Sequence, residues 1–331
     1  LKSKSTSVSL RSLCYHLAHA LQSYRFHSLD NKSFLGVEVL ALPRLLFASL
    51  LTCFLQATLV SADHRYPRDL SKNGPWKTEL TWLTASERSG FKINQNSAEI
   101  AISQAGVPTL AVVDGSLRAY FQWAPTDDEN IKYFNHIGYS DFHDGVWSLP
   151  KPIEVDFDSR NPLNYPFDPT IVPLTEGGFR LYFTSNNAEK RGSKANLSIG
   201  SATSADGVNF TREPGNRLQL DGKRINDCAI IYFNGKWHMI APDHDQPGVG
   251  YYATSNDGLT FERQDDLFQS RGAWLGNMVE RDGVVFFYGT GFTLKTSNFQ
   301  RWQVVQRHRL ADPGAAFFDG KMHVMSVGRS K

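Results

Sequence analysis

The sequence predicts an all-β chain that folds as a five-bladed β-propeller with four antiparallel strands in each blade. Three observations predict it: a hairpin pattern that occurs five times, a second motif that follows the hairpins, and a surplus pair of strands near the N-terminal side. The 331 residues suffice for such a domain, and 12% aromatic and 21% charged residues are compatible with a folded β-rich chain.

Each hairpin consists of two apolar runs joined by a dipeptide that ends in Gly. Asp-Gly, Asn-Gly and Gly-Gly tolerate a positive φ at both central positions, which the twist of a two-residue hairpin requires. The turns follow one another after 63, 57, 48 and 37 residues, which indicates an internal repeat. They are Asp114-Gly115, Gly177-Gly178, Asn234-Gly235, Asp282-Gly283 and Asp319-Gly320.

A second motif follows the hairpins at the point where a third strand would turn into a fourth. Residues 204–210, Ser-Ala-Asp-Gly-Val-Asn-Phe, have a near twin in residues 255–261, Ser-Asn-Asp-Gly-Leu-Thr-Phe, and looser copies occupy 140–147 and 296–302. Each copy ends on an aromatic residue that can pack between sheets. Hairpin and motif together predict four antiparallel strands, which is the unit of a propeller blade.

The last hairpin lacks outer strands of its own, because only a few residues follow it. The missing pattern occurs before the first blade, in Leu80 to Leu83, the turn of residues 86–91, and Phe91 to Ile93. We therefore expect the N-terminal segment to supply the outer strands of the last blade. This closure would leave no open sheet edge.

Residues 1–62 have the pattern of a leader with a secretory signal peptide. Arg44 precedes a short apolar region at about 45–55, and small residues at Val60-Ser61-Ala62 suit cleavage after Ala62. The alternative is an uncleaved membrane anchor, which the short apolar region disfavours. We predict a linker at 63–75, the propeller at 76–331, a secreted or periplasmic location, and no stable membrane span after cleavage.

Charge and cysteine content exclude several classes of function. Six of the basic and two of the acidic residues lie in the leader, so residues 63–331 carry 29 basic and 31 acidic residues. This balance gives no reason to expect nucleic acid as a partner. Cys14 and Cys53 also lie in the leader, and Cys228 stands in an apolar strand, where we expect it in the core. No zinc-ligand spacing and no phosphate-binding glycine loop occurs, and we expect a monomer.

Strand direction predicts where polar side chains gather. If each first strand runs down to its turn, its start lies at the mouth of the central channel, beside the end of the second strand. The five starts are Val107, Asp168, Asp227, Leu275 and Asp312. The ends of second strands add Asp243, His244 and Arg329 to the same rim.

Acidic residues that converge on one funnel are what cleavage of a glycosidic bond needs. One carboxylic acid protonates the leaving oxygen, and a second carboxylate activates water or attacks the sugar carbon. Neighbouring acids shift one another's pKa, so that one of them stays protonated near neutral pH. Asp168, Asp227 and Asp312 are therefore the candidate catalytic residues. The alternative for each Asp is the capping of a turn, and for His244 it is a solvated loop position.

Hairpins such as residues 178–183, the two Asp-Pro strand starts and the five repeats resemble the five-bladed propellers of glycoside hydrolase families 43, 32 and 62. The Ser-x-Asp-Gly-x-x-Phe motif resembles the structural Asp boxes of sialidases. The resemblance implies a base Asp on the first blade, a pKa-tuning Asp on the third and an acid Glu on the fourth. Asp227 matches the third position, whereas Val107 and the stretch 271–275 depart from the pattern. It also implies that no cofactor is required and that a Ca²⁺ ion could occupy the channel.

Two functions follow from these observations. The first is a secreted glycoside hydrolase of divergent type that acts on an oligo- or polysaccharide, with Asp243, His244 and Arg329 positioning the sugar. The second is a non-catalytic propeller that binds carbohydrate, in which Trp123 and Trp274 stack on sugar rings. A propeller that acts on phosphate or nucleotide esters is a remote third.

Overall fold

The computed structural model describes residues 69–156, 165–186 and 197–328. The chain separates into two compact units, residues 1–62 and 63–331. The predicted leader lies outside the described residues, as does Arg329. None of the helices that are described is long and apolar enough to cross a membrane.

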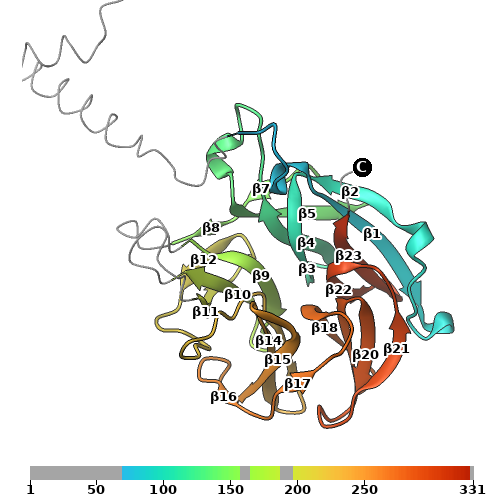
Figure 1. Cartoon of the computed structure of the whole chain (residues 1–331). Coiled ribbons are helices and arrows are strands. Elements are labelled where there is room, and N and C mark those ends of the chain that lie inside the picture. The colour runs from blue at the N-terminus through green and yellow to red at the C-terminus, as the bar shows by residue number, and fades with distance from the viewer. Residues whose placement is uncertain (1–68, 157–164, 187–196, 329–331) are drawn as a thin grey trace, which may run out of the picture. The chain divides into compact units, whose positions relative to one another are not determined.

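The second unit is a five-bladed β-propeller, which confirms the predicted fold class (Figure 1). In blades 1, 3 and 4 the innermost strand comes first in the chain. Blade 2 has an additional edge strand, β8, which precedes its other strands in the chain and pairs in parallel with β12. Within the described ranges, 3₁₀ helices lie in the connections: η1 (Pro75–Lys77), η2 (Glu87–Ser89), η3 (Gln95–Ser97) and η4 (Ile131–Tyr133).

The strands of the five blades have the following bounds. Blade 1 contains β3 (Ala105–Val113), β4 (Ser116–Trp123), β5 (His136–His143), β6 (Val146–Trp147) and β7 (Lys151–Pro152), and blade 2 contains β9 (Phe167–Pro173), β10 (Phe179–Asn186), β11 (Leu197–Ser204), β12 (Asn209–Arg212) and β8 (Glu154–Val155). Blade 3 contains β13 (Ala229–Phe233), β14 (Lys236–Asp243), β15 (Gln246–Ser255), β16 (Glu262–Arg263) and β17 (Leu267–Phe268), and blade 4 contains β18 (Ala273–Arg281), β19 (Val284–Thr290), β20 (Phe292–Thr296) and β21 (Gln303–Arg307). Blade 5 contains β22 (Ala311–Phe318), β23 (Lys321–Gly328), β1 (Glu79–Ser86) and β2 (Glu99–Ser103).

Blade 5 is completed by N-terminal strands, as the sequence predicts, but the second of them is β2 at Glu99–Ser103. The predicted strand from Phe91 to Ile93 is wrong: these residues lie in the connection between β1 and β2, and Phe91 and Ile93 pack in the core between blades 4 and 5. Strand β1 pairs along its whole length with β23, from Glu79 opposite Gly328 to Ser86 opposite Lys321, and β2 pairs with β1. Figure 1 shows the blue-to-cyan β1 beside the red β23. The innermost strands contact their neighbours in the order β3, β9, β13, β18, β22 and back to β3. The ring is therefore closed without a free inner edge.

Four of the five predicted turns are two-residue hairpins with the expected backbone conformation. Both central residues have positive φ, for example 49° at Asp114 and 75° at Gly115, and the same holds at the Asn234-Gly235, Asp282-Gly283 and Asp319-Gly320 turns. In blade 2 the connection is longer than predicted: Phe179 pairs with Pro173 and the Gly177 N–H donates to the Leu174 carbonyl, so Gly177 and Gly178 have positive φ but end the turn. In the other four blades the turn dipeptides are thus the local reason that the first and second strand form a hairpin.

The Asp-box motif forms a compact turn held by its own side chains. The Ser204 hydroxyl donates to Asp206 Oδ1 (2.8 Å), and that oxygen accepts the backbone N–H of Val208 and of Asn209 at 2.8 Å each. Ser255 and Asp257 repeat the arrangement in blade 3, and Thr296 and Asn298 repeat it in blade 4. These motifs are structural turns, as the sialidase-like resemblance implies.

A tyrosine from the preceding blade ties several of these turns into the ring. Tyr120 of blade 1 donates to the carbonyl of Gly207 (2.8 Å), and Tyr182 of blade 2 donates to the carbonyl of Gly258 (2.9 Å). At the junction of blades 3 and 4 the equivalent positions are Ile240 and Phe299, and both side chains are buried in one cluster. The tyrosine hydrogen bond that joins blades 1 and 2 and blades 2 and 3 is thus replaced by apolar packing between blades 3 and 4.

The apolar side chains form five clusters, one at each junction between neighbouring blades. Cys228 is fully buried in the cluster between blades 2 and 3, which confirms its predicted place in the core. Because every cluster joins two blades, the core sits between the sheets and leaves the ends of the innermost strands free to line a central site.

Replacing Gly258 by Ala is expected to destabilise the protein more than replacing Gly235 by Ala. Both glycines have positive φ (71° and 79°), so either substitution costs about 1–2 kcal/mol in backbone strain. A Cβ at Gly258 would also stand 2.5 Å from Arg180 Nη1, 2.8 Å from Trp237 Cε2 and 2.9 Å from the Tyr182 hydroxyl, whereas nothing lies within 4 Å of one at Gly235. Scanning calorimetry should show a decrease in Tm of roughly 2–4 °C per kcal/mol, about twice as large for Gly258→Ala. Equal decreases would show that these close contacts contribute nothing.

Candidate active site

Four of the five predicted strand starts share a backbone feature. Val107, Asp168, Asp227 and Asp312 have positive φ values of 50°, 50°, 52° and 48°, whereas in blade 4 the positive φ (151°) falls at Gly276, one residue after Leu275. Pairing with the second strand shifts register at this point in blades 1, 2, 4 and 5. Such a bulge redirects a side chain, and Asp tolerates the left-handed region better than most residues. The repeat thus places equivalent side chains around one axis.

Three of these side chains form a group of interacting carboxyls. Burial and the charges of Asp312 and Asp168 raise the pKa of Asp227 well above its usual range. Burial and the charge of Asp168 raise the pKa of Asp312 to about 7, although a hydrogen bond from Asp227 opposes this increase. The structure therefore brings Asp168, Asp227 and Asp312 together, with Asp227 protonated and donating to Asp312.

Asp168 is the member of this group that ionises most readily. Burial raises its pKa to about 6, while hydrogen bonds from Thr184 and Asn226 to its carboxylate act in the opposite direction. Thr184 Oγ1 donates to Asp168 Oδ2 at 3.1 Å, and Asn226 Nδ2 lies 3.5 Å from the same oxygen. Asp168 therefore ionises at a lower pH than Asp227, which retains its proton longer.

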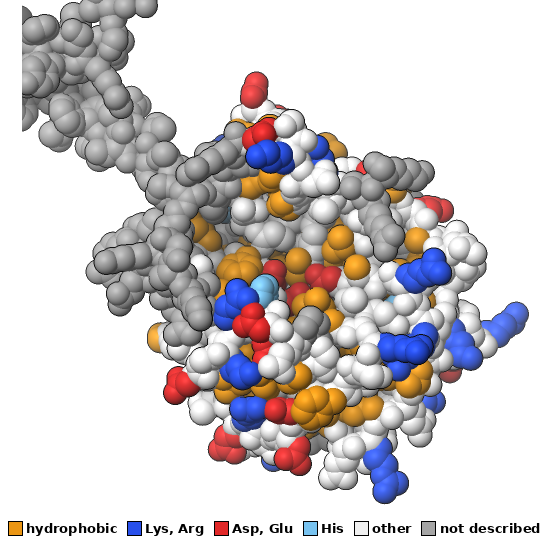
Figure 2. All heavy atoms as spheres, viewed as in Figure 1, with side chains coloured by type: hydrophobic (Ala, Val, Ile, Leu, Met, Phe, Trp, Pro, Cys, Tyr) orange, Lys and Arg blue, Asp and Glu red, His pale blue; other side chains and the backbone are white. Residues whose placement is uncertain are grey.

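Exposure differs among the three carboxyls. Asp227 is only 5% exposed, whereas Asp168 and Asp312 are half-buried. Figure 2 shows acidic side chains at the centre of the propeller face, bordered by basic and histidine side chains. Asp168 and Asp312 can thus meet a ligand, and Asp227 supports them from below.

A polar layer closes the channel beneath the carboxyls. Asn277 Nδ2 of blade 4 donates to Thr109 Oγ1 of blade 1 at 3.1 Å, and both side chains are buried. Blades 1 and 4 are not neighbours in the ring, so this bond crosses the axis. Each of these residues follows its strand start by two positions, which makes this layer the floor of the site.

Asp243 has its carboxylate occupied by neighbouring groups of the protein. It is 1% exposed, and its oxygens accept from the Tyr251 hydroxyl (2.6 Å), Lys223 Nζ (3.2 Å) and the Asp245 N–H (2.8 Å). Burial acts to raise its pKa, but these hydrogen bonds outweigh burial and lower it. Asp243 was predicted to bind the sugar directly, yet it has no exposed surface with which to do so.

The two predicted stacking residues are also buried. Trp274 is 1% exposed and packs edge-on against Phe287 and Phe292, and Trp123 is 4% exposed and stacks on Tyr133. A stacking platform needs an exposed ring face, so neither indole can serve as one here. These tryptophans occupy blade junctions because their size suits the core.

His244 is exposed, in agreement with the alternative that it occupies a solvated loop position. Its backbone N–H donates to the Arg224 carbonyl at 2.8 Å. Within the described residues no group of three or more His, Cys, Asp or Glu side chains could hold a metal ion. The Ca²⁺ ion implied by the resemblance stays a prediction.

Sequence reasoning missed Thr184 and Lys223. Thr184 also accepts the backbone N–H of Asp227 (2.9 Å), so one hydroxyl organises two of the three acids. The repeat offered a signal for it: Thr290, at the matching end of a second strand in blade 4, accepts the N–H of Asp312 at 2.8 Å.

No family model matches the sequence, and no curated protein matches it. Solved structures similar to the chain include a family 117 glycoside hydrolase from Zobellia galactanivorans (14% identity, 77% of this chain and 92% of that chain covered, TM-score 0.49). They also include an exo-beta-1,3-galactanase from Phanerochaete chrysosporium with galactose (10%, 70% and 61%, 0.48). A third is a GH32 beta-fructofuranosidase from Bombyx mori (13%, 83% and 61%, 0.47). The chain therefore spans only 61% of the last two structures.

Replacing Thr184 by Val should raise the pKa of Asp168 further, because the ionised form loses a hydrogen bond. A hydrogen bond to a charged group contributes about 1.5–3 kcal/mol, which corresponds to roughly 1–2 pKa units. Thr290→Val is the matched control, since Thr290 accepts the backbone N–H of Asp312 just as Thr184 accepts that of Asp227. Carboxyl ¹³C NMR titration of both variants measures the effect. An unchanged Asp168 titration in Thr184→Val would contradict the assigned bond.

Proposed function

We propose that the protein is a glycoside hydrolase that cleaves an oligo- or polysaccharide with Asp168, Asp227 and Asp312. The observation that carries this proposal is the group of three interacting carboxyls, in which Asp227 is hydrogen-bonded to Asp312 and holds its proton to a higher pH than Asp168. A protonated and an ionised carboxyl at one site are the two components that glycosidic cleavage requires.

The arrangement supports a division of roles. The Asp227–Asp312 pair donates its proton to the glycosidic oxygen as the bond to the leaving sugar breaks, and the half-buried Asp312 is the member that reaches the substrate. Asp168 takes a proton from water that attacks the anomeric carbon, or attacks that carbon itself and is released by water in a second step. Both routes consume one water molecule and return the proton to the acid pair.

The pair of acids stands in place of the separate acid Glu that the family resemblance implies. Blade 4 has Leu275 at its strand start, and blade 1 has Val107. Because a proton shared by two carboxyls is held to a higher pH than one on an isolated Asp, the pair supplies an acid near neutral pH without a Glu.

Hydrolysis of a panel of aryl glycosides and neutral oligosaccharides by the purified protein tests the proposal. The control is a variant in which Asp168, Asp227 and Asp312 are all replaced by Asn. We expect reducing sugar to be released by the wild type alone. Binding of an oligosaccharide without hydrolysis would instead support a carbohydrate-binding propeller, and neither binding nor hydrolysis would refute both.

A further inference from the structure

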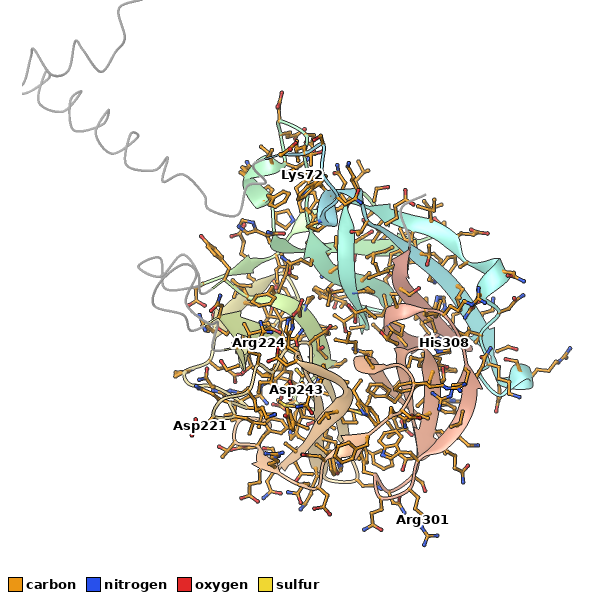
Figure 3. The ribbon with its side chains drawn as sticks, in the orientation of Figure 1. Lys72, Asp221, Arg224, Asp243, Arg301 and His308 are labelled. Atoms are coloured by element: carbon orange, nitrogen blue, oxygen red, sulfur yellow. The ribbon has the colours of Figure 1, made fainter. Side chains whose placement is uncertain are left out.

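The segment that leads into Asp227 carries a lysine held in place by a buried network. Asn226 contacts the Asp168 carboxylate, and Ile225 forms a β-bridge with Asp243. Lys223 precedes Asp227 by four residues, at most about 13 Å of extended chain. Figure 3 shows Arg224 and Asp243 close to each other beside the ring centre.

Asp243 fixes the position of the Lys223 ammonium group. Its Oδ2 accepts from Lys223 Nζ at 3.2 Å and from the Tyr251 hydroxyl at 2.6 Å, while Oδ1 is held by the Asp245 N–H. The carboxylate cannot rotate without breaking these bonds. Lys223 itself has 39% of its side chain exposed, so the network presents an otherwise flexible group to solvent in one orientation.

The ammonium group retains a donor for a ligand. Of its three N–H groups, one is directed to Asp243 and one to the Tyr251 hydroxyl, which leaves one that is not bound within this network. A donor that is already oriented loses less entropy when it binds, and this favours its use in recognition.

The charges at this rim indicate the chemical class of the ligand. Lys223 pairs with Asp243, and Arg224 pairs with Asp245, so two cations are balanced by two carboxylates. The ionised Asp168 adds negative charge at the centre. The net charge of these groups is therefore negative and would repel an anionic substituent. The hydroxyl and ring oxygens of a neutral sugar carry no charge and require only hydrogen-bond donors.

We infer that Lys223 binds a hydroxyl or ring oxygen of a neutral sugar next to the acid site, with Asp243 and Tyr251 as positioning residues. The inference rests on the proposed function. It replaces the direct sugar contact predicted for Asp243 with a contact made by its lysine partner.

Isothermal titration of neutral and acidic oligosaccharides into Asp168→Asn protein tests this inference, because this background should bind without hydrolysis. The probes are xylo-, arabino-, galacto- and fructo-oligosaccharides, with oligogalacturonate as the acidic sugar. Adding Lys223→Met should weaken binding of the preferred neutral probe by about 10- to 100-fold, since a hydrogen bond from a charged donor is lost. The Tyr251→Phe change should weaken it several-fold, although Tyr251 is 2% exposed and cannot touch the sugar.

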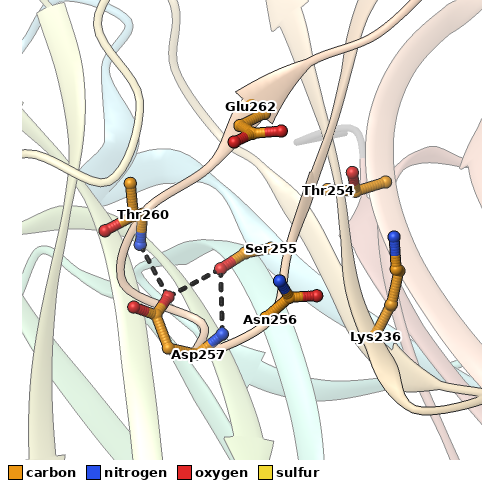
Figure 4. Close-up of a pocket in the computed structure, with 7 residues that line it drawn as sticks. All are labelled: Lys236, Thr254, Ser255, Asn256, Asp257, Thr260 and Glu262. Atoms are coloured by element: carbon orange, nitrogen blue, oxygen red, sulfur yellow. Dashed lines mark hydrogen bonds between the residues drawn. The ribbon is translucent and has the colours of Figure 1, made fainter.

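Lys236→Met is the matched control. Lys236 begins the strand that ends at Asp243 and lines a cavity of about 150 Å³ beside the Asp257 turn (Figure 4). It lies at the far end of β14 from the acid site, so its replacement should leave affinity unchanged. A Lys223→Met/Asp243→Asn double variant avoids an unpaired buried carboxylate and should show the same weakened binding.

The outcomes separate this inference from the proposed function. Unchanged affinity in both Lys223 variants would overturn the inference while leaving the proposed function in place. Preferential binding of oligogalacturonate would overturn the neutral ligand class. If no probe binds and the wild type hydrolyses none, the proposed function fails and the inference fails with it.

Discussion

Asp168→Asn is expected to lower kcat/KM for the preferred glycoside by about 10³-fold or more, the scale of losing a general base or a nucleophile. Asn keeps the size of the side chain and can still accept the 3.1 Å hydrogen bond from Thr184. It can neither take up a proton from water nor attack the sugar carbon. The loss should therefore appear mainly in kcat, as measured by initial rates across a range of substrate concentrations.

The matched control is Asp265→Asn, which changes an exposed residue between β16 and β17 at the outer edge of blade 3. Its rate should equal that of the wild type. Hydrolysis by Asp168→Asn at the wild-type rate would remove Asp168 from the mechanism. A fall in Tm that matches the fall in activity would point to misfolding, so calorimetry accompanies the rate measurements.

The sequence was sufficient for the ring and for the three acids, because both depend on the repeat. The Gly-containing turns fix each hairpin locally, and a count back from the turns to Asp168, Asp227 and Asp312 uses only strand direction. The closure of blade 5 by a segment that precedes blade 1 could also be predicted, because a blade without outer strands needs a partner from elsewhere in the chain. The second strand of that segment is predicted at Phe91 to Ile93, whereas it is β2 at Glu99–Ser103.

The burial and the hydrogen-bond partners of individual site residues could not be predicted, because they depend on which side chains of other blades and loops lie next to them. Trp123 and Trp274 stand near strand ends in the sequence, but their burial is decided by packing between blades, which periodicity does not report. Asp243 follows a strand in the same way as a rim residue would. Only the positions of Lys223 and Tyr251, 20 and 8 residues away, show that its carboxylate is occupied.

Asp227→Asn is expected to stabilise the protein increasingly as the pH rises above about 5. In the folded protein Asp227 keeps its proton because burial and the charges of Asp312 and Asp168 raise its pKa, whereas the unfolded chain ionises near pH 3.9. Above that pH the native state binds the extra proton, so its stability falls by about 1.4 kcal/mol per pH unit until the folded pKa is reached. Asn has no proton to hold and keeps a donor toward Asp312.

Three histidines, of which His238 and His323 are buried and His308 is half-buried, change the pH dependence in the opposite direction. The difference between variant and wild type is therefore the quantity to measure. Burial lowers the pKa of His238, and it lowers the pKa of His308 and His323 to about 4. The unfolded chain then binds the extra protons below about pH 6.5, and stability is lost as the pH falls through that range. These contributions are the same in both proteins and cancel in the difference.

The Tm of Asp227→Asn minus that of the wild type should therefore increase with pH, by roughly 3–6 °C per pH unit until the folded pKa of Asp227 is reached, given about 2–4 °C per kcal/mol for a domain of this size. Scanning calorimetry at matched ionic strength measures it, and Asp265→Asn again serves as the control with a flat difference. A flat difference for Asp227→Asn would mean that Asp227 ionises normally in the folded protein. The site would then lack its proton donor at neutral pH, because the acid role assigned to the Asp227–Asp312 pair depends on that retained proton.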